Sequence, residues 1–434
     1  MNMMLEGVGG IGLLMAVLFL LRMPVGFAMA AVGFAGLWHV MGLPAALGLA
    51  GNEIWENFSS YGLTVIPLFV LMGQICFYSG VNQRLYRTAY CWLGSIRGGM
   101  AMATVMACAG FSAISGSNSA TAATMSTVAL PEMKKYGYSP ILSTGAVAAG
   151  STLGVVIPPS VVFIIYGLQT GTSISSLFLS GVVPGLLLVT LFLLIIAWMC
   201  RLHPSWGPAG PGVTWRERLA SLSGSAEMLV LFALVMGGMA FGLFTPSEAG
   251  AAGAGLSILL NAATGKLGPK GLWVAVMDTL RVSCMIFVII MGAVIFGRFL
   301  AVTRLPFDVA DTVGHLNMPG WGVMIVISVI YLLGGMIMDA LALLLITLPI
   351  FFPLAQALGF DPVWFGAFIC VLTTMGAISP PVGIASYVVA AMSPGVSLAE
   401  VFRGGNWFLL GFAVCLALML MFPGIVLWLP GLAA

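Results

Sequence analysis

The stretch from Gly98 to Pro131 constrains this chain most, because its 34 residues carry no charged side chain and hold a hydroxyl-rich patch at their middle. A single membrane-spanning helix needs about 20 residues to cross roughly 30 Å of hydrocarbon. The stretch is therefore too long for one span and too short for two spans with a loop. Two half-length arms that meet at a polar tip fit this length. Because lipid cannot satisfy the bare backbone of such a tip, we expect a re-entrant hairpin whose tip is a binding site near mid-membrane.

Composition places the whole chain in the lipid bilayer. Of its 434 residues, 61% are hydrophobic and only 6% are charged, whereas a soluble domain carries about 25% charged residues. The net charge of +2 gives no sign of a nucleic-acid partner. The seven cysteines are scattered without a C-x-x-C pair and the three histidines lie far apart, so we expect no metal set of these residues and no cofactor.

Apolar runs predict the spans of an all-α polytopic membrane protein. We expect spans at about 7–21, 25–41 and 64–80, an interfacial helix around Trp55, the first hairpin at 98–131, a broken span at 140–169 and a span at 177–200. The more polar stretch 201–225 is predicted to be a linker between two halves, 1–200 and 226–434. The second half offers spans at 227–244, 249–264 and 283–303, a second hairpin at 319–353, a broken span at 362–392 and a last span at about 405–428.

The two halves match at a constant offset of 222 residues. The offset takes Pro131 to Pro353 and the pair Pro158-Pro159 to Pro380-Pro381. Each half then holds about five crossings and one hairpin, and because five is odd, the second half must lie upside down. We therefore predict two inverted-topology repeats, each with one re-entrant helical hairpin.

Charge orients the chain in the membrane. If Arg22 is cytoplasmic, the cytoplasmic ends of the spans collect 13 of the 15 basic residues, and only Arg298 and Arg304 lie outside. Basic residues concentrate on the cytoplasmic side of membrane proteins. This distribution predicts a cytoplasmic linker, both termini on the outer side, and hairpins that enter from opposite faces.

The two hairpin tips and the two broken spans carry the polar groups suited to ion binding. An interrupted helix leaves carbonyls for a cation and N–H groups for an anion, and neutral oxygens suit sodium better than a divalent ion. In each case close helix packing is the alternative explanation for a single small polar residue. The first repeat offers Ser112, Ser115, Ser117, Asn118, Ser119 and Thr121 opposite Ser151, Thr152, Gly154 and Ile157; the second offers Gly334, Gly335 and Asp339 opposite Thr373, Thr374, Gly376 and Ser379.

Asp339 is the only acidic residue deep in an apolar run. Charge at that depth is costly, so function is the default interpretation. We expect a role at the second ion site or in orienting the hairpin, and an N-cap of the second helical arm is compatible with either role.

Some of these features are compatible with an enzyme or with a passive channel. The segment Ile114-Ser115-Gly116 is compatible with an intramembrane serine protease, but no histidine lies in the central apolar stretches to act as a base, so the chain is not expected to be an enzyme. A passive channel is the stronger rival, although it does not require two inverted hairpins that meet at mid-depth.

The same motifs resemble a known family. The run Gly110-Phe-Ser-Ala-Ile-Ser-Gly-Ser-Asn-Ser-Ala-Thr121, the segment Gly150-Ser-Thr-Leu-Gly154 and the segment Ile378-Ser-Pro-Pro381 are similar to the large membrane subunit of tripartite ATP-independent periplasmic (TRAP) transporters. The resemblance covers essentially the whole chain.

The resemblance implies an elevator-type, sodium-coupled importer of an organic acid in the bacterial inner membrane. It also implies two partners, a small four-helix membrane subunit and a periplasmic substrate-binding protein. By residue, it places sodium site 1 at Ser112, Ser115, Gly154, Ile157 and Pro158, and sodium site 2 at Gly334, Gly376, Ser379 and Val382. The runner-up family, the divalent-anion/sodium symporters, shares the hairpin design but uses no binding protein. A C4-dicarboxylate, a sugar acid and a similar carboxylate all remain open as substrate.

Overall fold

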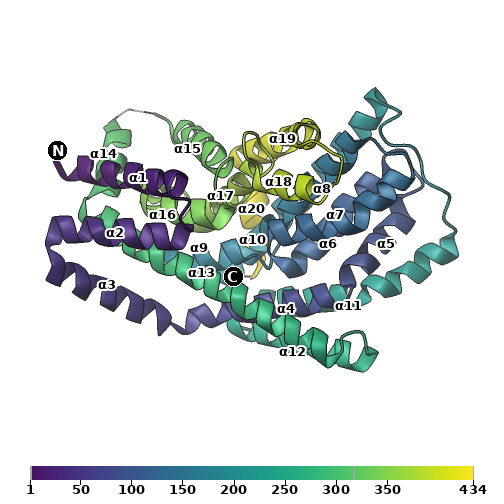
Figure 1. Ribbon diagram of the computed structural model, residues 1–434, viewed down its shortest axis with the longest axis horizontal. Helices are drawn as coiled ribbons and strands as arrows, with labels where there is room; N and C mark the ends of the chain where they lie inside the picture. The colour runs from purple at the N-terminus through teal and green to yellow at the C-terminus, as the bar shows by residue number, and fades with distance from the viewer. Residues whose placement is uncertain (1, 316–317, 434) are drawn as a thin grey trace.

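The structure, a computed structural model, describes residues 2–315 and 318–433. The described residues form helices joined by short loops, and no strand occurs among them. Within this part of the chain, eight helices are long and apolar enough to cross a membrane. The predicted fold class, an all-helical polytopic membrane protein, is therefore confirmed (Figure 1).

The first half of the chain contains two arms of a hairpin and one interrupted helix. Its elements are α1 (Asn2–Leu20), α2 (Val25–Met41), α3 (Leu43–Phe58), the short 3-10 helix η1 (Tyr61–Thr64), α4 (Val65–Tyr78), α5 (Val81–Leu93), the hairpin arms α6 (Gly99–Ser115) and α7 (Asn118–Lys135), the interrupted helix α8 (Pro140–Val156) with α9 (Val161–Thr170), and α10 (Ile174–Leu202).

The second half repeats this order. Its elements are α11 (Trp215–Ala240), α12 (Pro246–Thr264), α13 (Pro269–Val302), α14 (Leu305–His315), the hairpin arms α15 (Gly320–Gly335) and α16 (Ala340–Ala357), the interrupted helix α17 (Pro362–Gly376) with α18 (Ile384–Ala391), α19 (Leu398–Met421) and α20 (Gly424–Ala433).

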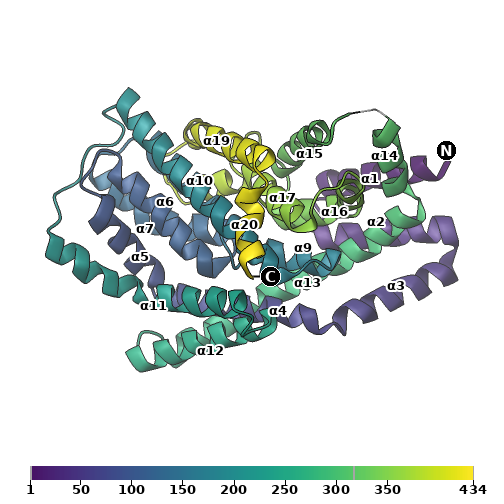
Figure 2. The same cartoon turned by 180° about the vertical axis from the view of Figure 1, so that it is seen from behind.

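Helix bounds repeat at the offset found in the sequence. Adding 222 to the bounds of α7, 118 and 135, gives 340 and 357, which are the bounds of α16. The first residue of α8, 140, becomes 362, where α17 begins. The two hairpins enter from opposite ends of the long axis of the molecule, with their tips at its centre (Figures 1 and 2).

Three segments differ from their predicted extents. The helices reach further into the predicted linker 201–225, because α11 begins at Trp215 with a capping box in which Thr214 and Glu217 satisfy each other's backbone N–H groups. The predicted span 283–303 is only the second part of a longer helix, because the 34-residue α13 begins at Pro269 and also includes the basic stretch with Lys270 and Arg281. The predicted last span 405–428 divides at Pro423 into α19 and α20, since proline cannot continue the hydrogen-bond ladder.

The interrupted helix α8 lies at the centre of one group of helices. Its residues from Leu142 to Val156 are all buried, and it packs against α6, α7 and α19. Small residues allow this crowding: a Cβ atom at Gly145 would lie 2.6 Å from the backbone of Gly404 in α19. A second group consists of α13 packed on α2 and α4, with α12 on α4 and α11.

Candidate functional site

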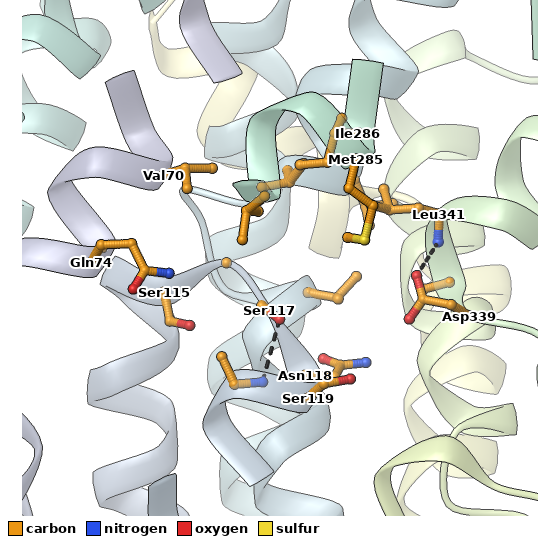
Figure 3. A pocket seen from close by; sticks show the side chains of 18 of the residues that line it. Val70, Gln74, Ser115, Ser117, Asn118, Ser119, Met285, Ile286, Asp339 and Leu341 are labelled. Carbon is orange, nitrogen blue, oxygen red and sulfur yellow. Dashed lines mark hydrogen bonds between the residues drawn. The ribbon is translucent and has the colours of Figure 1, made fainter. Parts of the chain in front are cut away.

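The tips of the two hairpins face one central cavity. The cavity has a volume of about 220 Å³ and lies between both tips, the start of α9, and the helices α4 and α13. Figure 3 shows Ser115, Ser117, Asn118 and Ser119 on one side and Asp339 with Leu341 on the other, with Met285 and Ile286 of α13 above them. The structure thus brings the polar tip of the first hairpin and Asp339 of the second into one space, as the repeat predicts.

The first tip is held by one cap and by close contact with the interrupted helix. Ser117 is the N-cap of α7, and its Oγ accepts a hydrogen bond from the N–H of Ala120 at 3.4 Å. Gly116 has a φ of +61°, which only glycine adopts at little cost. A Cβ atom at Gly154 would lie 2.9 Å from the carbonyl oxygen of Ser117. Glycine at 154 is therefore what lets α8 approach the tip.

Oxygen atoms without hydrogen-bond partners gather where this tip meets the break between α8 and α9. Pro158 and Pro159 carry no N–H, so the carbonyls of Gly154 and Val155 lose the donors that a continuous helix would supply. The Val155 carbonyl accepts from the Cys370 thiol at 3.2 Å. The side-chain oxygens that are buried without a hydrogen bond at this tip and break are Ser112 Oγ and Asn118 Oδ1, and Ser160 Oγ lies beside them with the Cys370 thiol as a neighbouring polar group. Such orphaned oxygens are costly unless a ligand meets them.

The second tip has a hydrogen-bonded backbone like the first, where the Ser112 carbonyl accepts from the Gly116 N–H at 3.2 Å, but among the described residues it lacks the unpartnered side-chain oxygens. The Gly334 carbonyl accepts from the N–H groups of Ile337 and Met338 at 3.0 and 2.9 Å, and the Gly376 carbonyl accepts from the Ser379 N–H at 3.0 Å. Close packing fixes the two elements, since a Cβ atom at Gly335 would lie 3.1 Å from the Cα of Gly376. The residues predicted for sodium site 2 therefore lie close together. They offer fewer oxygens without a hydrogen bond than the residues predicted for site 1.

Asp339 is both a cap and part of the cavity wall. It is the N-cap of α16, and its carboxylate accepts from the Leu341 N–H at 3.2 Å. At the repeat offset it corresponds to Ser117, the N-cap of α7. The expected capping role is present, and the carboxylate is also exposed to the cavity.

The other predicted hydroxyls lie behind the tips. The four side chains are fully or almost fully buried and bond to carbonyls three residues earlier in their own helices: Ser151 to Ala148, Thr152 to Ala149, Thr373 to Cys370 and Thr374 to Val371. They do not line the central cavity. Ser379 Oγ likewise bonds to the Met375 carbonyl at 3.0 Å, while Val382 is partly exposed.

Two polar residues of this region were missed from the sequence. Ser160 directly follows the Pro158-Pro159 pair, a position that could have marked it, and it is fully buried. Gln74 of α4 lines the cavity beside Ser115 (Figure 3). Its signal was a lone amide in an otherwise apolar helix.

The cavity contains one formal charge among its described lining residues, the carboxylate of Asp339, and no lysine, arginine or histidine. The N-termini of α7, α9 and α16 lie at its walls, and each offers backbone N–H groups and the positive end of a helix dipole. An anionic group that binds here meets neutral donors, helix N-termini and any bound cation.

Comparison with known proteins gives one consistent family. Residues 13–425 match the family described as the tripartite ATP-independent periplasmic transporter, DctM component. The C4-dicarboxylate TRAP transporter large permease protein DctM of Pseudomonas aeruginosa is 36% identical over 383 residues, which cover 87% of this chain and 88% of that protein. The sialic acid TRAP transporter large permease protein SiaM of Vibrio cholerae is 30% identical over 425 residues, with 98% and 97% of the two chains covered.

Among solved structures, the YdaH transporter of Alcanivorax borkumensis has a similar fold. The TM-score is 0.62 at 15% sequence identity, and the match covers 89% of this chain and 90% of that one. This likeness concerns the fold alone.

Proposed function

We propose what this chain transports and how it does so. The chain belongs to the DctM component family of tripartite ATP-independent periplasmic transporters, so it is the large permease subunit of a secondary transporter and not an enzyme. The chain would import an organic acid anion across the bacterial inner membrane, coupled to sodium ions that move with it. The observation that supports this most is the set of unpartnered buried oxygens where the first hairpin tip meets the break between α8 and α9.

Sodium site 1 would use Ser112, Ser115, Gly154, Ile157 and Pro158, with Asn118 from the predicted tip and the newly found Ser160 as further candidate oxygens. Uncharged hydroxyl, amide and carbonyl oxygens are the ligands that a hard monovalent cation accepts. Sodium site 2 would use Gly334, Gly376, Ser379 and Val382. Because the Gly334 carbonyl already accepts from two N–H groups in this conformation, a local rearrangement would free it for sodium.

The substrate would bind in the central cavity between the tips. A cation held at either tip offsets the charge of Asp339 and adds to the positive potential of the helix N-termini, so the anion binds better when sodium is present. This coupling through one shared cavity is what a symporter requires. Motion of both hairpins and both interrupted helices against α2, α4, α12 and α13, an elevator movement, would carry the cavity across the membrane.

The names of the relatives suggest which class of substrate to test first. Two relatives are named as transporters of C4-dicarboxylate and of sialic acid, both organic acids. We propose a C4-dicarboxylate as the first substrate to test. The partners would be a small four-helix membrane subunit and a periplasmic binding protein that delivers the substrate.

The test is uptake by the reconstituted transporter. Proteoliposomes that hold this chain and its small subunit are given radiolabelled succinate and purified binding protein, with a sodium gradient or with potassium in its place. We expect uptake only with both the gradient and the binding protein. Sodium-driven uptake without a binding protein would show that this chain works alone, as divalent-anion/sodium symporters do, and equilibration without any gradient would support a passive channel.

A further inference from the structure

Gln74 is an isolated hydrogen-bonding side chain in a membrane helix. Its helix, α4, is apolar around it, with Val70, Leu71, Met72 and Gly73 before it and Ile75 after it. Among the described residues, no hydrogen bond of its side-chain amide is found. The side chain is half-buried and lines a cavity, so its amide is accessible to a ligand there.

The amide of Gln74 lies at the wall of the central cavity. Figure 3 shows it beside Ser115 of the first hairpin. The other cavity-lining residues contributed by α4 and α13 are Val70, Gly73, Phe77, Val282, Met285 and Ile286. On this side of the cavity, Gln74 is thus the one hydrogen-bonding side chain among the described residues.

The fold itself does not require an amide at this position. At the repeat offset, Gln74 corresponds to Phe296 of α13, because 74 plus 222 is 296. Phe296 is fully buried and packs against its neighbours, including the ring of Phe299 at 6.0 Å between centroids. Phe296 does not line the cavity, so the amide occurs only in the repeat whose residue at this position faces it.

We propose that Gln74 is a substrate-binding residue that helps to determine specificity, and this proposal rests on the proposed function. Its carboxamide N–H donates to a carboxylate oxygen of the substrate bound between the tips. No basic side chain among the described residues lines the cavity, so a neutral donor of this kind is the protein's means of meeting a carboxylate there.

The position of Gln74 on α4 gives this contact a second property. All other polar side chains of the cavity, from Ser115 to Ser119 and at Asp339, belong to the two hairpins. If the hairpins move against α4, the substrate keeps those contacts and loses the one to Gln74. The contact then raises substrate affinity in the conformation seen here and not in the opposite one.

The test uses Gln74→Met, which preserves side-chain length without hydrogen bonding, and Gln74→Glu, which adds a second carboxylate to the cavity. In the reconstituted transporter, we expect Gln74→Met to raise the KM for succinate about 10-fold in one direction of transport, as loss of a hydrogen bond to a charged group predicts. The KM in the other direction and the sodium concentration at half-maximal rate remain within about twofold. Gln74→Glu raises the KM further, because like charges repel.

A matched control is Gln83→Met, the same substitution at an exposed position of α5 outside the cavity. It leaves the KM unchanged. A folding defect is excluded if the midpoint temperature of thermal unfolding of Gln74→Met is equal to or higher than that of the wild type. If wild-type uptake is sodium-dependent but Gln74→Met has the wild-type KM in both directions, the role of Gln74 is wrong while the proposed function stands. If the wild type shows sodium-dependent uptake of neither succinate nor sialic acid, the proposed function and the role of Gln74 both fail.

Discussion

At the scale of single residues, the two hairpin tips differ in what their oxygens contact. Ser112 is fully buried, and its hydroxyl has no hydrogen-bond partner. Ser257 of α12, by contrast, donates to the Ala254 carbonyl of its own helix at 2.8 Å, whereas Ser126 and Ser283 are buried without a partner as Ser112 is. An unpartnered hydroxyl in a packed interior weakens the fold, so Ser112 is best explained by a ligand that meets it.

Replacing Ser112 by alanine tests this explanation. Without sodium, we expect the free energy of unfolding to stay within about 1 kcal/mol of wild type or to rise, because no hydrogen bond is lost. The sodium concentration at half-maximal uptake should increase about 10-fold, which corresponds to about 1.4 kcal/mol of lost ion binding. Sodium titration of uptake and thermal unfolding in potassium buffer measure the two effects.

The control is Ser257→Ala, which removes a bonded hydroxyl far from the tips in the chain. It should lower stability modestly and leave the sodium titration unchanged. An unchanged sodium titration in Ser112→Ala would mean that its hydroxyl does not bind the ion, and that the polar tip serves packing instead.

Residue patterns predicted some of this site and missed the rest for a physical reason. Ser112, Gly154 and Asp339 were identifiable because they stand at a polar tip, before a Pro-Pro break and alone in an apolar run. Ser160 and Gln74 were not identified, because their importance depends on which side chains lack a partner and which face a cavity. Those properties depend on contacts between segments far apart in the chain. The saturation of the Gly334 carbonyl was hidden in the same way.

At the scale of helices, one carboxylate joins three elements on the predicted cytoplasmic side. Glu227 of α11 pairs with Arg84 of α5 at 2.7 Å and with Lys266, which follows α12. Arg84 also donates to the Ser79 carbonyl at 2.9 Å, at the end of α4. The side chain of Glu227 is only 17% exposed, so this network is better shielded than an ordinary surface ion pair.

Replacement of Glu227 by glutamine should loosen the contact of α5 with α11 and α12. Because two cations lose one partly buried partner, we expect a loss of about 1–2 kcal/mol in the free energy of unfolding. Arg281→Gln is the control, since its pair with Asp278 in α13 is largely exposed and should contribute less than about 0.5 kcal/mol. Thermal unfolding of the purified proteins gives both values. If the two substitutions lower the free energy of unfolding equally, the Glu227 network stabilises the fold no more than an exposed ion pair does.

Elements were predicted best where length and proline spacing decide them. The predicted first hairpin at 98–131 corresponds to α6 and α7, and the predicted broken span at 362–392 to α17 and α18. The prediction failed where a basic amphipathic stretch joins an apolar one, because α13 runs through both as one helix. Helix propensity does not change at that boundary. Its continuity from Pro269 to Val302 is seen only in the structure.

At the scale of the whole molecule, the distribution of charge predicts which face is cytoplasmic. The loop between α10 and α11 joins the two halves, and Ala209 is exposed within it. In an Ala209→Cys variant, we expect a membrane-impermeant maleimide to label residue 209 only after the cells are permeabilised. The parent chain, whose Cys284 is exposed and whose other cysteines are buried or half-buried, measures the background. Labelling of residue 209 in intact cells would reverse the orientation.

The proposed elevator movement requires that α16 of the second hairpin slide past α13. The two helices touch at Gly297 and Pro349: a Cβ atom at Gly297 would lie 3.9 Å from the Cβ of Pro349. This separation is close to the mean of about 3.8 Å in disulfides. A Gly297→Cys/Pro349→Cys pair is therefore placed to form a covalent link between the two helices in this conformation.

Oxidation of this double variant should stop transport, because a disulfide permits none of the displacement that an elevator cycle demands. We expect sodium-driven uptake to fall by more than about 10-fold on oxidation and to recover with dithiothreitol. Uptake by each single variant should change with neither the oxidant nor dithiothreitol. Recovery on reduction separates the link from any defect caused by the substitutions. Substrate binding should persist in the linked protein, since neither residue lines the central cavity. Undiminished uptake with the disulfide formed would show that α13 and α16 keep their contact through the cycle, and the cavity would then have to open by local movement of the tips alone.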